Sequence, residues 1–76
     1  MNQEVLQEAV NGVIKRFFAN KGYGFITPDG GGEDVFFHYT QVDGESSSVK
    51  EGQKVLFSIV RGPKGLQASG ITVITE

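Results

Sequence analysis

The chain has 76 residues, among them 11 glycines but no cysteine or tryptophan, and its 7 basic and 9 acidic side chains give a formal net charge of −2. This length suits one small domain, and the absence of cysteine excludes disulfide scaffolds, thiolate metal sites and cysteine catalysis. The apolar runs are too short to span a membrane and no signal peptide opens the chain, so we expect a cytoplasmic protein. The negative charge argues, at first sight, against a nucleic-acid partner.

The first ten residues predict no clear element. One face of a short helix could be lined by Val5, Leu6, Ala9 and Val10, but an isolated helix of this length is marginal in water. We therefore expect residues 1–10 to be an N-terminal extension, either an arm or the start of the first strand, and residues 11–75 to form the domain.

Glycine-rich turns separate short runs of Val, Ile, Phe and Tyr, a pattern typical of an all-β domain. The predicted strands are, in chain order, Ala9–Phe18, Gly22–Thr27, Asp34–His38, Lys54–Val60 and Gln67–Ile74. Turns are expected at Pro28–Gly32 and Gly62–Gly65, and a polar loop at Gln41–Gly52. Five short antiparallel strands with a long connection after the third predict a closed barrel, which leaves no open sheet edge.

Aromatic residues are concentrated in the second and third predicted strands and just before them. Because side chains alternate along a strand, Tyr23 and Phe25 share one face, and Phe36 and His38 share a face of the next strand. The opposite faces already supply core candidates, namely Ile26, Val35 and Phe37. A barrel this small cannot bury both faces, so we expect an exposed set of rings of the kind that stacks unpaired bases.

Basic side chains accompany these rings. Lys15, Arg16 and Lys21 lie between Gly12 and Thr27, a stretch without any acidic residue. Binding depends on the local field rather than on the net charge, so the charge of −2 does not exclude a nucleic acid. The simpler interpretation, that Phe25 and Phe36 are core residues, leaves these neighbouring cations unexplained.

Two segments resemble the motifs of a known family. Lys21–Ile26 is similar to the first ribonucleoprotein-type motif of the cold-shock domain, and Val35–Tyr39 is similar to the second. Further similar segments are Gly12–Lys15, Glu51–Val55 with Phe57, and Gly62–Gly65 followed by Gln67 and Ala68. The resemblance covers about Gly12 to Val73 and implies an OB-type, five-stranded antiparallel closed barrel. It also implies binding of single-stranded RNA and DNA, RNA-chaperone activity, and a link to cold adaptation and relief of transcription termination.

The resemblance implies a set of contact residues, in which the aromatic rings stack bases, the cations meet phosphates, and His38 stacks or donates a hydrogen bond. With the further basic residues, the expected nucleic-acid-binding residues are Lys15, Arg16, Phe17, Lys21, Tyr23, Phe25, Phe36, His38, Tyr39 and Lys64.

The chain departs from the family pattern at three places. Arg16 stands where the family has tryptophan, and its guanidinium could stack on a base or pair with a phosphate. Phe18 stands where the family usually has asparagine, and it could fill the core or replace the missing ring. The loop after Tyr39 is slightly shorter and lacks its usual aromatic residue, with Glu45 and Ser46–Ser48 there instead. Two missing stacking positions predict weaker binding per site.

No residues suggest catalysis, a metal or a cofactor. His38 is the only histidine, and the carboxylates lie in predicted loops, so we expect no metal site. The carboxylates of Asp29, Glu33 and Asp34 surround three glycines, which favours a solvated hairpin loop. We therefore expect a binding protein and not an enzyme.

Two other functions fit the residues. A protein-interaction or structural module would keep the barrel without the ligand, and its oligomers would bury the Leu56 and Val60 face of the fourth strand. An OB-type translation factor or ribosomal module would prefer structured RNA to oligo-dT. Under the leading hypothesis the partners are single-stranded RNA and DNA, and the protein is a monomer, with a strand-swapped dimer as the alternative.

Overall fold

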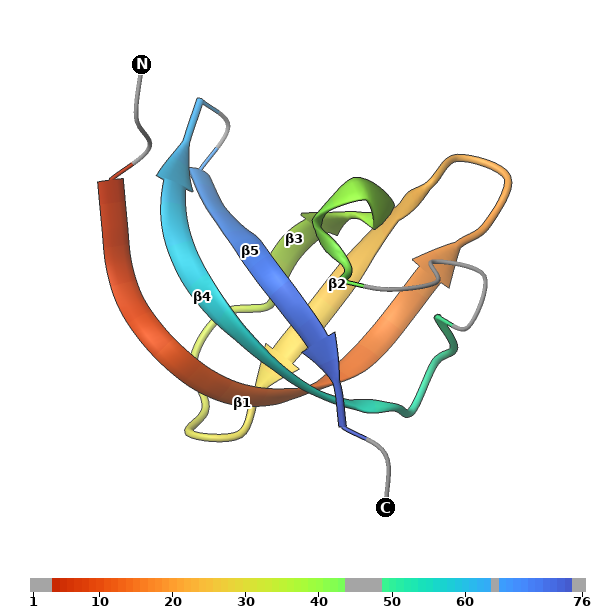
Figure 1. Ribbon diagram of the computed structural model, residues 1–76, viewed down its shortest axis with the longest axis horizontal. Helices are drawn as coiled ribbons and strands as arrows, with labels where there is room; N and C mark the ends of the chain where they lie inside the picture. The colour runs from red at the N-terminus through yellow and green to blue at the C-terminus, as the bar shows by residue number, and fades with distance from the viewer. Residues whose placement is uncertain (1–3, 44–48, 64, 75–76) are drawn as a thin grey trace.

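The computed structural model describes residues 4–43, 49–63 and 65–74, and within these residues the chain forms a closed barrel of five strands (Figure 1). The elements are β1 (Glu4–Phe18), β2 (Tyr23–Pro28), β3 (Val35–His38), the 3₁₀ helix η1 (Tyr39–Gln41), β4 (Lys54–Gly62) and β5 (Gly65–Val73). The predicted all-β closed barrel is therefore confirmed. In the described part of the chain, no helix has the length and apolar character needed to cross a membrane.

The strands follow the order β1-β2-β3-β5-β4 around the barrel. β1 pairs antiparallel with both β2 and β4, β2 pairs antiparallel with β3, and β4 with β5. The barrel closes between β3 and β5, which pair in parallel with Phe36 opposite Gln67, a geometry that the expectation of antiparallel strands did not include. A parallel closure is compatible with the chain because η1, the following loop and β4 separate the two strands.

β1 begins at Glu4, five residues before the predicted start at Ala9. Its first residues pair with the end of β4, with Glu4 opposite Arg61 and Val5 opposite Val60. Ala9 has a positive φ of 57°, and the register of β1 against β4 shifts between Gln7 and Val10. Because they pair with β4, the residues from Glu4 onward are the start of the first strand and not a helix. The bulge at Ala9 bends this long strand.

The core lies inside the barrel and follows the predicted alternation. Ile26, Val35 and Phe37 are fully buried, as are Val55 and Phe57. The predicted oligomer face of β4 is wrong in one residue, because Val60 is only 3% exposed while Leu56 is 37% exposed. Ile59 and Val60 are buried although they are consecutive, so the alternation of exposed and buried side chains along β4 breaks there and Val60 does not share the exposure of Leu56.

Candidate nucleic-acid interface

Three half-buried rings lie together on the outer surface of β2 and β3. The antiparallel register sets Phe25 opposite Phe36 and Tyr23 opposite His38. The ring centroid of Phe36 lies 5.5 Å from that of Tyr23 and 6.0 Å from that of Phe25, and the Tyr23 and Phe25 rings are 6.4 Å apart. The structure thus brings together the rings that the two-residue period placed on one face.

Phe18 extends this group from β1. It pairs with Tyr23 across the strands, and the two ring centroids lie 5.4 Å apart at an interplanar angle of 52°. Phe18 is half-buried and stands outside the hydrophobic core cluster. Of the two roles that the sequence left open, the structure therefore places Phe18 beside the exposed rings. We call Phe18, Tyr23, Phe25 and Phe36 the ring platform.

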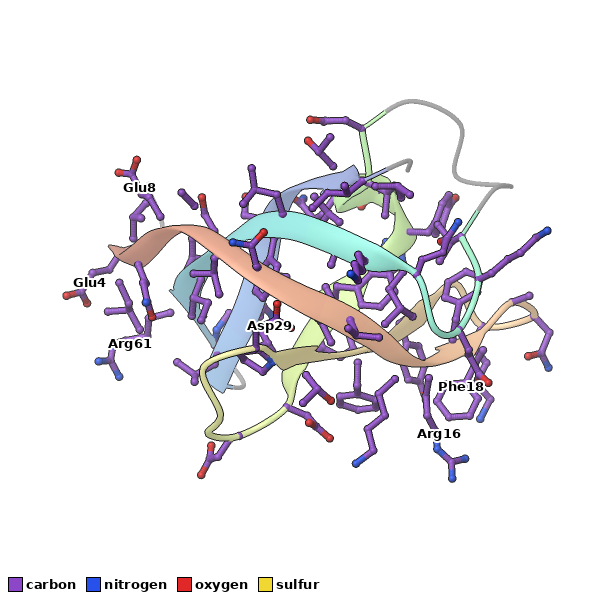
Figure 2. The ribbon with its side chains drawn as sticks, turned by 90° about the horizontal axis from the view of Figure 1, so that it is seen from below. Glu4, Glu8, Arg16, Phe18, Asp29 and Arg61 are labelled. Atoms are coloured by element: carbon purple, nitrogen blue, oxygen red, sulfur yellow. The ribbon has the colours of Figure 1, made fainter. Side chains whose placement is uncertain are left out.

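A bulge in β1 presents two cations next to the platform. The register against β2 shifts between Ile14, which is opposite Ile26, and Arg16, which is opposite Phe25. Because the shift interrupts the alternation of side chains, Lys15 and Arg16 are both exposed although they are consecutive. Arg16 and Phe18 lie near one end of β1, far from Glu4 at the other end (Figure 2).

His38 and Tyr39 form a second pair of rings at the end of β3, with centroids 4.8 Å apart. The backbone N–H of Thr40 donates to Nδ1 of His38 at 3.4 Å, and the Thr40 hydroxyl lies 2.9 Å from the same nitrogen. Thr40 thus occupies Nδ1, and Nε2 is the ring nitrogen of His38 with no hydrogen bond to the described residues. No group of three or more His, Cys, Asp or Glu side chains that could hold a metal ion occurs among the described residues.

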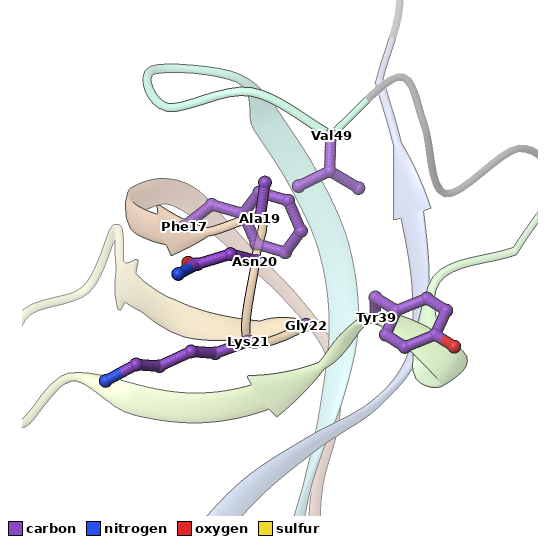
Figure 3. A pocket seen from close by; sticks show the side chains of 7 residues that line it. All are labelled: Phe17, Ala19, Asn20, Lys21, Gly22, Tyr39 and Val49. Atoms are coloured by element: carbon purple, nitrogen blue, oxygen red, sulfur yellow. The ribbon is translucent and has the colours of Figure 1, made fainter.

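Phe17 and Lys21 lie apart from the ring platform. The Phe17 ring stacks on buried Phe37, with centroids 5.9 Å apart and an interplanar angle of 14°. Phe17 and Lys21 line a hollow of about 500 Å³ between the β1–β2 turn and Tyr39 (Figure 3). Its other lining residues are Ala19, Asn20, Gly22 and Val49. Lys64, which was also expected to contact nucleic acid, lies outside the described residues.

The acidic residues nearest the site come from distant parts of the sequence. Nζ of Lys15 lies 3.1 Å from Oδ2 of Asp34, and the Thr27 hydroxyl donates to Oδ1 of Asp34 at 2.9 Å. The hydrogen bonds from Lys15 and Thr27 hold the pKa of Asp34 below its ordinary value of 3.8. Asp34 is exposed and lies outside the strands, as predicted for a solvated hairpin loop, but its carboxylate also has partners on β1 and β2. Glu51 accepts a hydrogen bond from the backbone N–H of Phe17 at 3.1 Å.

Two cations of the site remain available to a ligand. No carboxylate among the described residues forms an ion pair with Arg16 or Lys21, and both side chains are exposed. The predicted basic stretch is therefore only partly neutralised, by the contact between Lys15 and Asp34. Positive charge remains beside the ring platform and beside the hollow next to Tyr39.

A small closed barrel that presents a group of rings on its outer surface, with cations beside and near them, defines a class of single-strand nucleic-acid-binding proteins. This chain belongs to the cold-shock domain family, because the model of the 'Cold-shock' DNA-binding domain matches residues 10–74. The predicted family is thereby confirmed, and with it the binding of nucleic acid.

Curated relatives agree with this membership. The chain is 52% identical over 64 residues to a cold shock-like protein CspA of Stigmatella aurantiaca, which covers 83% of this chain and 94% of that protein. It is 43% identical over 70 residues to a cold shock-like protein CspA of Shewanella violacea, and the match covers 91% of this chain and 100% of that protein. Among solved structures, drosophila Unr CSD456 has a similar fold, with a TM-score of 0.77 and 24% identity, covering 92% of this chain and 28% of that one.

Proposed function

We propose that this protein binds unpaired RNA and DNA strands by stacking their bases on the ring platform, and that it acts in the cytoplasm as an RNA chaperone. The observation that carries the proposal is the platform itself, in which neighbouring ring centroids lie 5.4 to 6.4 Å apart on the exposed side of three adjacent strands. Aromatic stacking contributes ~1–3 kcal/mol per base and tolerates any sequence, because every base has a π-face.

The contacts divide into stacking and phosphate contacts. Tyr23, Phe25 and Phe36 stack bases, with Phe18 as a fourth ring at one end. His38 and Tyr39 offer a further stacking position and the Nε2 nitrogen. The phosphates are met by Lys15, Arg16 and Lys21. Phe17 contacts the bound nucleic-acid strand at the hollow beside Tyr39. Few phosphate contacts imply that the rings supply most of the affinity.

Binding of this kind would act on RNA structure by mass action. A protein that binds only the open strand stabilises it relative to a hairpin, without ATP or catalysis. Weak hairpins that form at low temperature or that end transcription are the expected targets. Cold adaptation and relief of transcription termination are the processes that this activity would serve, with the protein acting as a monomer.

A second candidate function is protein association. Val5, Leu6 and Leu56 are large apolar side chains that are 52%, 39% and 37% exposed, and they lie on β1 and β4, away from the ring platform. Such residues could contribute to a protein contact. If this were the main function, the protein would self-associate or capture a partner and would bind oligo-dT poorly.

A titration of fluorescein-labelled oligo-dT at low salt, followed by anisotropy, tests the proposal. We expect saturable binding, and a loss of about 100-fold for the double variant Phe25→Ala plus Phe36→Ala, since two stacking contacts are removed. Leu56→Ala is the matched surface control and should bind as the parent does. Absence of binding at low salt, or unchanged affinity of the double variant, would overturn the proposal, and light scattering on the same samples would then report self-association.

A further inference from the structure

A hollow of about 300 Å³ adjoins the ring platform where β1 bulges. It is lined by Lys15, Arg16, Phe25 and Asp34. The Phe25 ring belongs to the platform, so a base that stacks on it has its edge facing the three charged side chains. The hollow therefore combines a stacking surface with side chains that can hydrogen-bond to a base edge.

The charged groups of this hollow have unused hydrogen-bonding capacity on both sides. Each carboxylate oxygen of Asp34 accepts one hydrogen bond, Oδ2 from Lys15 and Oδ1 from Thr27. A carboxylate oxygen can accept about two, so two acceptor positions remain. Arg16 carries about five N–H donors in a planar fork and has no ion-pair partner among the described residues. The hollow thus offers a carboxylate to paired donors and a guanidinium to paired acceptors.

Guanine matches this combination better than the other bases. It presents two adjacent donors, N1–H and the N2 amino group, on one edge, and two adjacent acceptors, O6 and N7, on the next. Cytosine has adjacent acceptors but a single amino donor group. Adenine alternates one donor with acceptors, and thymine and uracil place a carbonyl on each side of their one N–H, where a carboxylate would be repelled. A purine also covers more of the Phe25 ring.

We propose that this hollow is a guanine-selective subsite, in which Arg16 donates to O6 and N7 while Asp34 accepts from N1–H and N2–H, with the base stacked on Phe25. This inference rests on the proposed binding of single strands and adds a base preference to one position of it. Arg16 determines the preference, because a tryptophan at this position would offer stacking but no paired donors. The rest of the strand is bound without regard to sequence.

The test uses a series of dT heptamers in which one guanine replaces thymine at each position in turn. We expect one register to bind about tenfold more tightly than the all-thymine strand, as a bidentate contact adds that much discrimination. At that position 7-deazaguanine, which lacks N7, and inosine, which lacks the N2 amino group, should each lose most of the gain. Cytosine at the same position should gain less than guanine.

Two variants assign the contacts to their side chains. Arg16→Gln should remove the guanine preference and make guanine and 7-deazaguanine equal, while Asp34→Asn should make guanine and inosine equal. Arg61→Gln is the matched control, because Arg61 is also an exposed arginine and lies near the opposite end of β1 (Figure 2). Far-UV circular dichroism confirms that each variant is folded before its affinities are compared.

The outcomes separate this inference from the function on which it rests. If the heptamers bind but no guanine position improves affinity, or if Arg16→Gln keeps the preference, the guanine subsite is wrong and single-strand binding stands. If neither the thymine nor the guanine strands bind at low salt, the proposed function itself fails. A preference that survives both variants while the 7-deaza and inosine strands bind like guanine would mean stronger purine stacking alone, which also overturns the subsite.

Discussion

Phe36 and Phe37 are neighbours on β3 that face opposite sides of the barrel wall, so replacing each with alanine separates binding from stability. Phe37 is fully buried and its truncation should cost about 3–5 kcal/mol, because the ring leaves a cavity in the core. A core of this size supplies only a few kcal/mol in total, so Phe37→Ala should be largely unfolded at 25 °C. Phe36 is half-buried, and Phe36→Ala should cost about 1–2 kcal/mol and remain folded in the cold.

The affinity for oligo-dT should depend on Phe36, the residue whose loss costs less stability. Phe36 contacts Tyr23 and Phe25 on the platform, so Phe36→Ala should weaken oligo-dT binding by about 5- to 100-fold through the loss of one stacking contact. Phe36→Tyr keeps the ring and should bind nearly as the parent does. Urea denaturation followed by far-UV circular dichroism measures stability, and anisotropy at 10 °C measures affinity. Equal destabilisation by the two alanine variants, or full binding by Phe36→Ala, would refute the assignment of the two faces.

Two further predictions concern the packing around Gly24 and the hydrogen bonds of Asp34. A Cβ on Gly24 would lie 2.9 Å from the Phe37 ring and 3.0 Å from the backbone Cα of Phe17, so Gly24→Ala should lower the free energy of unfolding by about 2 kcal/mol or more. Gly30 has open space around it, so Gly30→Ala should change the free energy of unfolding by less than about 0.5 kcal/mol in the same urea titration. Because the folded-state pKa of Asp34 is depressed, its contribution to stability is present above its ordinary value of 3.8 and is lost as the pH falls through the lower folded-state value. When the pH is lowered from 5 into the range where Asp34 is protonated, thermal melts should show a smaller loss of stability for the Asp34→Asn variant than for the parent protein. An equal loss in the two proteins would contradict a stabilising role of the Asp34 carboxylate.

The alternation of side chains was enough to predict the barrel wall. Tyr23 and Phe25 on one face and Ile26 on the other follow directly from a period of two, and the structure has them there. The family motifs lie on these same strands, which is why membership was also evident from the sequence. The start of β1 at Glu4 was harder to predict, since its strand partner among the described residues is the end of β4, with Glu4 opposite Arg61, 57 positions later in the chain.

Long-range pairing and one bulge account for what the sequence did not show. A regular alternation from Ile14 would point Arg16 inward, and only the register shift against β2 turns it outward. Two charged residues between apolar Ile14 and Phe17 were the available signal of that bulge. The contact of Lys15 with Asp34 joins residues 19 positions apart and could not be read from a local window. The contact of Phe17 with nucleic acid stays a prediction, and its ring packs against core Phe37, apart from the ring platform.

A salt series of oligo-dT binding tests the central claim most directly, because it separates stacking from phosphate contacts. With Lys15, Arg16 and Lys21 as the phosphate contacts, the logarithm of the affinity should fall with the logarithm of salt concentration at a slope of about −2, since each contact on a single strand contributes about −0.7. Binding through the rings should persist at high salt and disappear in the Phe25→Ala plus Phe36→Ala variant. A much steeper slope, with affinity lost at high salt in the parent protein, would mean that charge and not the ring platform holds the strand.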